Sequence, residues 1–283
     1  MAILFPTDFS EQSVKTFGYA LEFAKKLNVP ITLIHVYHIP VMNPATIELG
    51  TNMVNEELLN ANETAMENKL KQFKDSLQAQ YANSYPDMVK VSGMVRMGLV
   101  GDEIMRTAEE INAKYIVIGV KQRNDLNRFL IGSSTMHIIN KSKIPVITVP
   151  ENFNQLSSVQ KIAYATDITF NDNTIIIKLL DLAKLFNATV KCFHVHDSKL
   201  EIENSIIDDF IEQYRAEANQ NLITFQLIDN LNVLDGIDYF VKENNIDLLC
   251  VLKQKHYWLD IFEKKITKHL VFNENVPMLI YHE

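Results

Sequence analysis

The chain has 283 residues, of which 47% are hydrophobic and 22% charged, and its formal net charge at pH 7 is −8. This length suits two domains that each bury a core of their own. No run of about 18 apolar residues is present to span a membrane, and the N-terminus lacks the features of a secretory signal, so we expect no membrane segment and a cytoplasmic location. The acidic balance would repel a phosphate backbone, which argues against nucleic acid as a partner.

Short β-type runs alternate with helical patterns along the first half of the chain. Strands are predicted at 2–6, 31–37, 89–95, 115–119 and 145–149, and helices at about 11–27, 51–83, 100–112 and 133–142. In the first helix Phe17, Leu21 and Ala24 recur at the spacing of a buried stripe. The alternation predicts right-handed crossovers and a parallel sheet with helices on both faces.

The second half of the chain repeats the first. The stretch "ILFPTDFS" at 3–10 lies over "IAYATDIT" at 162–169, an offset of 159 residues. Near the end of each copy the offset falls to 132, which places Pro145 over Pro277 and makes the second copy 27 residues shorter. The missing part lies in the long polar helix 51–83, whose counterpart is a helix of only about 200–219.

The repeat predicts an α/β protein built from two tandem doubly wound domains. Each would be a five-stranded parallel sheet with helices on both faces. The first domain would cover 1–150 and the second 159–283, and the polar, turn-prone segment 150–160 would join them.

A ligand crevice is expected beyond the carboxyl ends of the strands in the first copy. The loops that begin at Thr7, at Val36 and at Gly119 meet there. Gly132-Ser133 then opens the last helix, where unpaired N–H groups favour an anion and a glycine lets phosphate approach the main chain. Many helices begin with glycine or serine for capping alone, so this spacing by itself leaves phosphate binding open.

The order of elements, the "PTDFS" after the first strand, and Gly119 followed by "VKQRNDLNRFLI" and Gly132-Ser133 resemble the universal stress protein family. The resemblance covers the whole chain as two tandem copies and implies an adenine nucleotide alpha hydrolase-like fold. The family's nucleotide motif is Gly, two residues, Gly, nine residues, then Gly with Ser or Thr. Gly119, Gly132 and Ser133 match this register, whereas Gln122 stands in place of the middle glycine.

The resemblance implies roles for further residues of the first copy. Asp8 would meet the ribose or the adenine, and the backbone around Val36 would read the adenine edge, although Asp8 has an equal interpretation as a helix cap. The loop cations could meet phosphate or be solvated charges, and for Arg128 solvation is preferred. The predicted binding residues are Thr7, Asp8, Val36, Gly98, Gly119, Lys121, Gln122, Arg123, Gly132, Ser133 and Ser134.

The second copy lacks these features. Seven of the eight glycines belong to the first copy. At the aligned positions Val251, Lys264 and Lys265 replace the two motif glycines and the serine, so side chains fill the place of a phosphate. We therefore predict that only the first copy binds a nucleotide and that the second is a degenerate scaffold.

The histidines and cysteines give no sign of catalysis or metal binding. His35 and His194 are single histidines at the same place in an apolar strand of each copy, which favours a structural role. Cys192 and Cys250 are expected about 9–10 Å apart, on either side of the first strand of the second copy, too far to bridge. No catalytic triad order or Cys-x-x-Cys is present, so neither catalytic nor metal-binding residues are predicted.

Two functions remain in view. The first is a non-enzymatic regulatory protein of the stress response that binds ATP or AMP, with or without magnesium, and so changes its contacts with a protein partner. The alternative is a nucleotide-independent interaction scaffold that uses the helix 51–83. Slow ATP hydrolysis ranks last because no general base is visible. The resemblance also implies that the last strands, Val146–Val149 and Met278–Tyr281, pair so that one chain mimics a dimer, with further homodimerisation left open.

Overall fold

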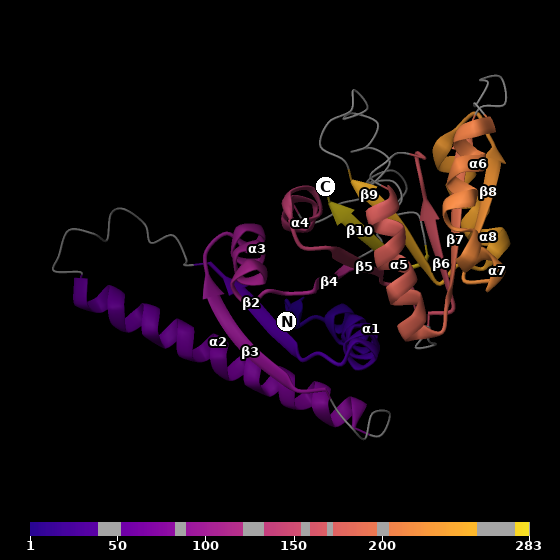
Figure 1. Ribbon diagram of the computed structural model, residues 1–283. Coiled ribbons are helices and arrows are strands. Elements are labelled where there is room, and N and C mark those ends of the chain that lie inside the picture. Colours follow the sequence, from indigo (N-terminus) through magenta and orange to yellow (C-terminus); the bar gives the residue numbers. More distant parts are fainter. Residues whose placement is uncertain are drawn as a thin grey trace. The chain divides into compact units, whose positions relative to one another are not determined.

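The computed structural model describes residues 1–38, 52–82, 89–120, 133–153, 159–168, 172–196, 204–253 and 275–282. The chain forms two compact units (Figure 1). The first comprises Met1–Ile118 and Ile131–Ile144, and the second comprises Gly119–Leu130 and Pro145–Glu283. None of the described helices is long and apolar enough to cross a membrane.

The sheet of the first unit is parallel, as predicted, with the strand order β3-β2-β1-β4. Its strands are β1 (Ile3–Pro6), β2 (Ile31–Tyr37), β3 (Val91–Met97) and β4 (Tyr115–Val120). The chain starts in the middle, runs out to β3 and returns to the other side of β1, so the order reverses between β1 and β4. Because all four strands are parallel, their carboxyl ends share one edge of the sheet.

The described residues of the first unit form four helices: α1 (Glu11–Leu27), α2 (Asn52–Tyr81), α3 (Val100–Glu110) and α4 (Ser133–Lys141). The N-cap of α1 is Ser10, whose hydroxyl accepts from the N–H of Ser13, and its C-cap is Asn28 in the left-handed conformation. Phe17 of the buried stripe meets Phe5 of β1 edge to face, with ring centroids 5.6 Å apart. The predicted stripe therefore holds α1 on the sheet.

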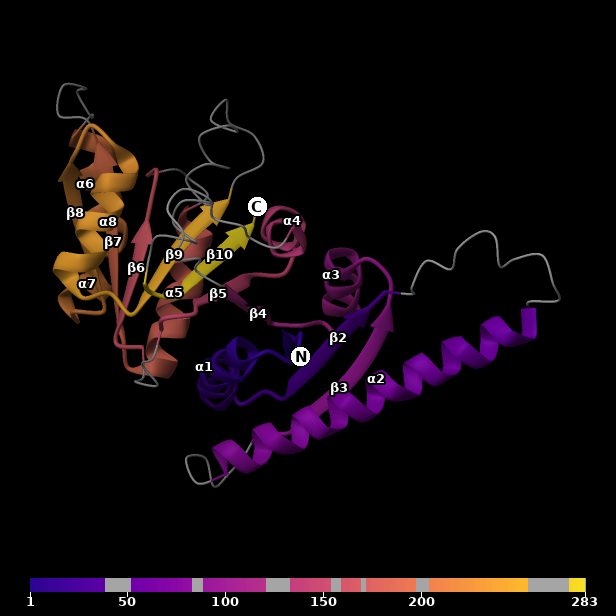
Figure 2. The ribbon, with the colours of Figure 1, turned by 180° about the vertical axis from the view of Figure 1, so that it is seen from behind.

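The helix α2 is long, as the sequence predicts, but only its C-terminal part is packed. Leu70, Phe73, Leu77 and Tyr81 are buried at three- and four-residue spacing, and the hydroxyl of Tyr81 donates to the carbonyl of Val14 (2.9 Å). Both views show α2 lying along β3 with its first turns projecting past the end of the strand (Figures 1 and 2).

The second unit confirms the prediction of a five-stranded parallel sheet, in the order β10-β9-β6-β7-β8. The strands are β6 (Lys161–Ala165), β7 (Thr189–His196), β8 (Ile223–Asp229), β9 (Leu248–Lys253) and β10 (Met278–His282). Cys192 and Cys250 lie opposite Tyr164 on its two sides, and both are free and buried. The predicted separation of these cysteines by the first strand is confirmed.

The helices of the second unit correct one prediction. They are α5 (Asp172–Phe186), α6 (Asn204–Gln213), α7 (Arg215–Asn219) and α8 (Val233–Asn244). The single helix expected at about 200–219 is wrong, because the chain breaks at Tyr214 between α6 and α7. The buried Tyr214 ring contacts Phe210, and its hydroxyl donates to Asn173 Oδ1 at 2.9 Å. These tertiary contacts outweigh the continuity of the helix.

The strand β5 (Val146–Pro150) pairs with β10 in the antiparallel sense. Met278 lies opposite Thr148, and Ile280 lies opposite Val146. This pairing confirms the contact expected between the last strands of the two copies. By sequence β5 belongs to the first copy, and it falls within the second compact unit together with its partner β10.

Candidate functional site

Several predicted residues gather where the strands of the first unit end. Thr7 and Asp8 follow β1, Val36 is the last residue but one of β2, and Gly98 follows β3. The N–H of Thr7 donates to the carbonyl of Ile34 (2.9 Å), which ties the turn after β1 to β2. The N–H of Gly98 donates to the backbone carbonyl of Tyr37 (3.1 Å) and ties the end of β3 to β2 in the same way. The structure therefore brings these four residues to one edge of the sheet.

The turn from Thr7 to Ser10 fixes the Asp8 carboxylate. Asp8 Oδ1 accepts from the N–H of Ser10 at 3.0 Å and from the hydroxyl of Ser13 at 2.9 Å. Asp8 therefore caps the turn that leads into α1. Its side chain is nevertheless exposed to solvent, which leaves it within reach of a ligand.

The histidine at this edge has a structural partner. Nδ1 of His35 lies 2.8 Å from the carbonyl oxygen of Thr7, and a carbonyl only accepts, so the ring nitrogen donates. In the second unit Nδ1 of His194 makes the same contact with the carbonyl of Thr166 at 2.7 Å. The structural interpretation of both histidines is confirmed, since each holds the turn after the first strand of its copy.

Phe9 is a residue that the sequence does not single out. Its φ is 64°, in the left-handed region that bulky side chains rarely adopt. Its ring contacts that of His35 at a centroid distance of 4.2 Å and that of Phe73 at 5.5 Å, and the ammonium of Lys69 lies 4.6 Å from its centre. The buried half of α2 thus packs directly on the turn that carries Asp8. No periodicity marks a lone aromatic residue inside such a turn.

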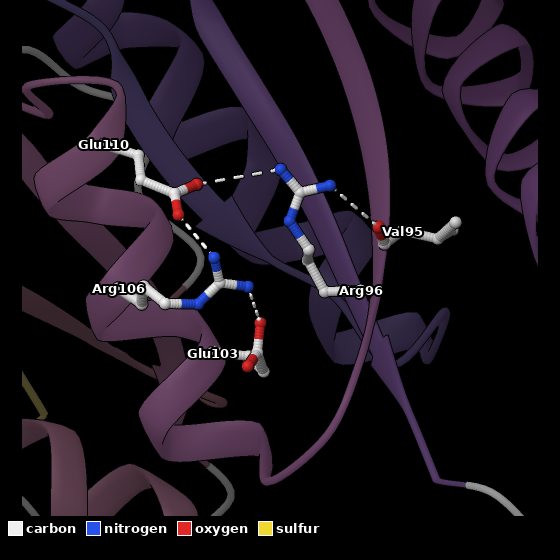
Figure 3. A network of polar contacts seen from close by, with 5 residues as sticks. All are labelled: Val95, Arg96, Glu103, Arg106 and Glu110. Carbon is white, nitrogen blue, oxygen red and sulfur yellow. Dashed lines mark hydrogen bonds and ion pairs between the residues drawn. The ribbon is translucent and has the colours of Figure 1, made fainter.

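Gly98 is required by its conformation and by a close neighbour. Its φ is +150°, and a β-carbon there would lie 2.9 Å from Cγ of Glu103. Figure 3 shows how that neighbour is held: Glu103 pairs with Arg106, and Arg106 pairs with Glu110. Glu110 also lies 3.7 Å from the guanidinium of Arg96 on β3. The network joins β3 to α3 on either side of Gly98.

The start of α4 is placed by contacts with α3. Ser133 and Ser134 are its first two residues. One turn later Nε2 of His137 lies 2.8 Å from Asp102 Oδ1, in the first turn of α3. Gly119 is the last residue but one of β4. The other predicted members, Lys121, Gln122, Arg123 and Gly132, lie outside the described residues.

The second unit repeats the turn after the first strand, but the residue that packs against this turn differs. The N–H of Ile168 donates to the hydroxyl of Thr166 at 2.9 Å, and Ile168 has a φ of 57°. At the position of Ser13, however, this copy has the buried Asp172, which accepts from the hydroxyls of Tyr164 and Thr166. A second carboxylate therefore stands where the first copy supplies a hydroxyl donor.

The negative charge of Asp172 contributes to the pKa shifts of neighbouring groups. Desolvation and then the negative charge of Asp172 raise the pKa of Asp167, which holds the place of Asp8. Burial and the same charge raise the pKa of Tyr164. Val251, which aligns with Gly119, lies in β9, while Lys264 and Lys265 lie outside the described residues. The described part of the chain contains no group of three or more His, Cys, Asp and Glu side chains placed to hold a metal ion.

Comparisons with known proteins agree with an α/β fold that occurs twice along the chain. A sequence model of the universal stress protein family matches residues 1–150, which is more than half of the chain. The chain therefore belongs to the universal stress protein family. A universal stress protein of Methanocaldococcus jannaschii is 27% identical over 151 residues, which cover 52% of this chain and 93% of the relative.

Solved structures match the fold over nearly the whole chain. The crystal structure of a universal stress protein from Archaeoglobus fulgidus has a TM-score of 0.72 at 17% identity and covers 100% of this chain and 96% of that chain. A protein from Pseudomonas aeruginosa has a TM-score of 0.62 at 12% identity and covers 99% of this chain and 92% of its own. The chain is therefore a tandem member of the family with two copies of the α/β fold.

Proposed function

We propose that this protein is a non-enzymatic regulator of the stress response, located in the cytoplasm, whose first copy binds an adenine nucleotide, ATP or AMP. The observation that carries the proposal is the Asp8 carboxylate. It is exposed, it is held by two donors from the start of α1, and it shares the carboxyl edge of the sheet with Val36 and Gly98. A fixed acceptor at this edge suits the hydroxyls of a ribose.

The other roles follow from the chemistry of the predicted residues. The main chain at Val36 would read the adenine, and the free N–H groups at Ser133 and Ser134 would face the phosphates. Gly119 and Gly132 would admit the phosphates close to the backbone, while Lys121, Gln122 and Arg123 would donate to them. Magnesium, if present, would be held by the phosphates and water rather than by a dedicated set of carboxylates.

The second copy is expected not to bind a nucleotide. The buried Asp172 accepts from Tyr164 and Thr166, and its charge lies close to Asp167. A ribose there would meet two carboxylates without the hydroxyl donor that Ser13 provides to Asp8. One nucleotide per chain follows from this difference.

A second candidate function is the nucleotide-independent scaffold. It is favoured by the first turns of α2, which extend past β3 and leave Leu58 43% exposed. In this alternative a protein partner would cover α2 and the edge of the sheet would stay empty.

The two functions are separated by calorimetry on the full chain with ATP, ADP and AMP, with and without magnesium. Wild type should bind one nucleotide per chain, and Asp8→Ala should weaken binding by about tenfold or more because a charged acceptor is lost. The matched control is Asp167→Ala, the same change in the second copy, which should leave the affinity unaltered. Absence of both heat and thermal shift at millimolar nucleotide would reject nucleotide binding and leave the scaffold.

A further inference from the structure

The strand β3 ends the sheet of the first unit, and among the described strands only β2 pairs with it. The N–H of Ile31 on β2 donates to the carbonyl of Lys90 (2.9 Å), and the N–H of Gly98 donates to the carbonyl of Tyr37 (3.1 Å). Because the main-chain groups of a strand face its two sides alternately, the even-numbered residues of β3 bond to β2. The odd-numbered residues turn their N–H and C=O groups outward; they are Val91, Gly93, Val95 and Met97.

One contact of Arg96 agrees with this assignment and marks where the open part of the edge ends. The guanidinium of Arg96 donates to the carbonyl of Val95 (3.3 Å) and lies 3.7 Å from the carboxylate of Glu110 (Figure 3). A charged side chain on an edge strand hinders pairing with a further strand. The outward groups before the Val95 carbonyl, above all those of Gly93, are the ones that a further strand could reach.

A groove lies beside this edge, between β3 and α2. Its cavity has a volume of about 180 Å³, several times the ~30 Å³ that one water molecule takes up in the liquid. Gly93 lets the helix come close, since a β-carbon there would lie 3.0 Å from Cδ2 of Leu70. The cavity is lined by Gly93, Met94 and Val95 of β3 and by Leu70, Lys71 and Lys74 of α2.

A helix wall beside a free strand edge is suited to one kind of ligand, an extended peptide. Such a peptide adds a strand to the sheet, so that its main chain supplies affinity while its alternate side chains enter the groove and supply specificity. Both views show α2 running along β3 (Figures 1 and 2), so the wall accompanies the edge rather than crossing it at a single point.

The charges of the groove favour an acidic peptide. Lys71 and Lys74 both line the cavity, and neither forms an ion pair with another residue in the described part of the chain. Glu67 is the one carboxylate of the lining, so the ammonium groups outnumber it. The net charge of −8 belongs to the whole chain and is screened beyond about 8 Å at physiological salt, so the lysines beside the groove decide the local preference.

A second copy of this chain suits the groove less well. Pairing of two identical β3 edges would bring Lys71 and Lys74 of both chains to the same interface. Like charges that face each other across an interface oppose association. A segment that carries carboxylates meets no such penalty.

We propose that the groove between α2 and β3 is a docking site for an extended acidic segment of another protein, which adds a strand to β3 beside Gly93. The carboxylates on one face of this strand would meet Lys71 and Lys74, because alternate side chains of a strand point to the same side. The inference goes beyond the proposed function and does not require it, since the predicted nucleotide-binding residues do not line the groove.

The first test measures peptide binding to the full chain by fluorescence anisotropy. The probe is a labelled octapeptide of alternating glutamate and valine, which should bind saturably, and an octapeptide of alternating lysine and valine should bind at least about tenfold more weakly. The double variant Lys71→Glu, Lys74→Glu should weaken binding of the acidic probe by about tenfold or more. No binding at millimolar probe, or equal binding of the two octapeptides, overturns the proposal.

A matched variant controls for the change in net charge. Lys15 on α1 and Lys141 on α4 are exposed and do not line the groove. The double variant Lys15→Glu, Lys141→Glu alters the net charge of the chain by the same amount, and its affinity for the acidic probe should stay within about twofold of wild type. If this variant loses as much affinity as the groove variant, the attraction is a property of the whole chain and the proposal fails.

Methylated peptides test the main-chain bonds directly. One version of the acidic octapeptide carries N-methyl groups on its glutamates and the other carries them on its valines. Only one of the two sets of N–H groups can face β3 while the carboxylates face the lysines. One version should therefore lose binding and the other should keep it, whereas loss in both or in neither contradicts strand addition.

Amide exchange followed by NMR locates the added strand. With saturating acidic octapeptide the outward amides of Gly93 and Val95 should exchange more slowly, while those of Ser92 and Met94, which face β2, should not change. If the amides of Gly93 and Val95 are already protected without peptide, the edge is covered by this chain or by a second copy. That result also overturns the proposal, and analytical ultracentrifugation then separates the two occupants.

Discussion

Phe9 shows how a single residue can couple a strained backbone to tertiary packing. A side chain with a β-carbon in the left-handed region costs about 1–2 kcal/mol. The ring of Phe9 offsets this cost through His35, Phe73 and Lys69, which come from β2 and α2. The packing of α2 therefore helps to stabilise the turn that carries Asp8.

An alanine variant is usually more stable than a glycine variant at the same position, and substitution of Phe9 should reverse this order of stability. Both Phe9→Ala and Phe9→Gly lose the ring contacts, but only glycine relieves the strain at φ 64°. After the greater entropy of an unfolded glycine is taken into account, Phe9→Gly should be more stable than Phe9→Ala by about 0.5–1 kcal/mol. Urea denaturation of the two variants measures the difference, and a more stable alanine variant would show that the backbone is relaxed.

The buried cysteines should make the second unit sensitive to alkali. Burial raises the pKa of both Cys192 and Cys250, and for Cys192 the charge of Asp172 adds to it. Unfolded thiols lose their protons near pH 9 while the folded ones keep them, so the unfolded state binds fewer protons and stability falls as the pH rises above that value.

The expected slope is up to about 1.4 kcal/mol per pH unit for each thiol. Denaturation with urea at pH 8, 9 and 10 should show this fall in wild type and a much flatter profile in the double variant Cys192→Ala, Cys250→Ala. Tyr214, whose pKa burial raises to about 12, begins to contribute as the unfolded phenol ionises near pH 10, and this contribution is the same in both proteins. An equal slope in both proteins would contradict the assignment to the thiols.

The chemistry of the turn after β1 was only partly predictable from the sequence. Asp8 was expected either to cap the helix or to bind; the helix cap is Ser10, and Asp8 holds the turn before it through Ser10 and Ser13. The left-handed Phe9 could not be foreseen, because its ring is stabilised by Phe73, a residue 64 positions away in the chain. The role of Asp172 was hidden for a different reason, since its partner Tyr164 belongs to an apolar strand that carries no polar signal.

At the level of elements, α2 divides into a packed half and an exposed half. Its last turns bury Leu70, Phe73 and Leu77 against the sheet, whereas Leu58 in the projecting half is 43% exposed. Helices in proteins draw most of their stability from such packing rather than from intrinsic propensity. The two halves should therefore respond differently to the same substitution.

Leucine to alanine changes at two positions of α2 test this division. Leu77→Ala should lower the free energy of unfolding by about 2–4 kcal/mol because the side chain is fully buried. Leu58→Ala removes the same atoms from an exposed position and should change the free energy of unfolding by no more than about 0.5 kcal/mol. Circular dichroism in urea measures both values. Similar losses of unfolding free energy in the two variants would mean that the projecting half is covered in solution.

Element boundaries followed the sequence where periodicity was strong and departed from it where tertiary contacts decided. The helix α1 was expected at about 11–27 and is Glu11–Leu27. β3, expected at 89–95, is Val91–Met97, because its pairing with β2 continues to the register of Tyr37 with Met97. The break at Tyr214 likewise depends on Asn173 and Phe210, which no local pattern reveals.

For the whole molecule, duplication was the most informative signal in the sequence. The offset repeat predicted tandem copies and a parallel sheet in each, and the expected contact between the last strands is confirmed by the pairing of β5 with β10. The compact units do not follow the copies, because β5 is part of the first copy by sequence but falls within the second unit.

The pairing of β5 with β10 makes the join between the copies different from a boundary between independent modules. A single cut in the polypeptide after β5 would leave that strand covalently attached to the first copy while its hydrogen-bonded neighbour remained in the second. The severed pieces would still hold each other through main-chain bonds. Without that pairing β5 and β10 would each present unpaired N–H and C=O groups at a strand edge, so each copy protects the other from edge-to-edge association.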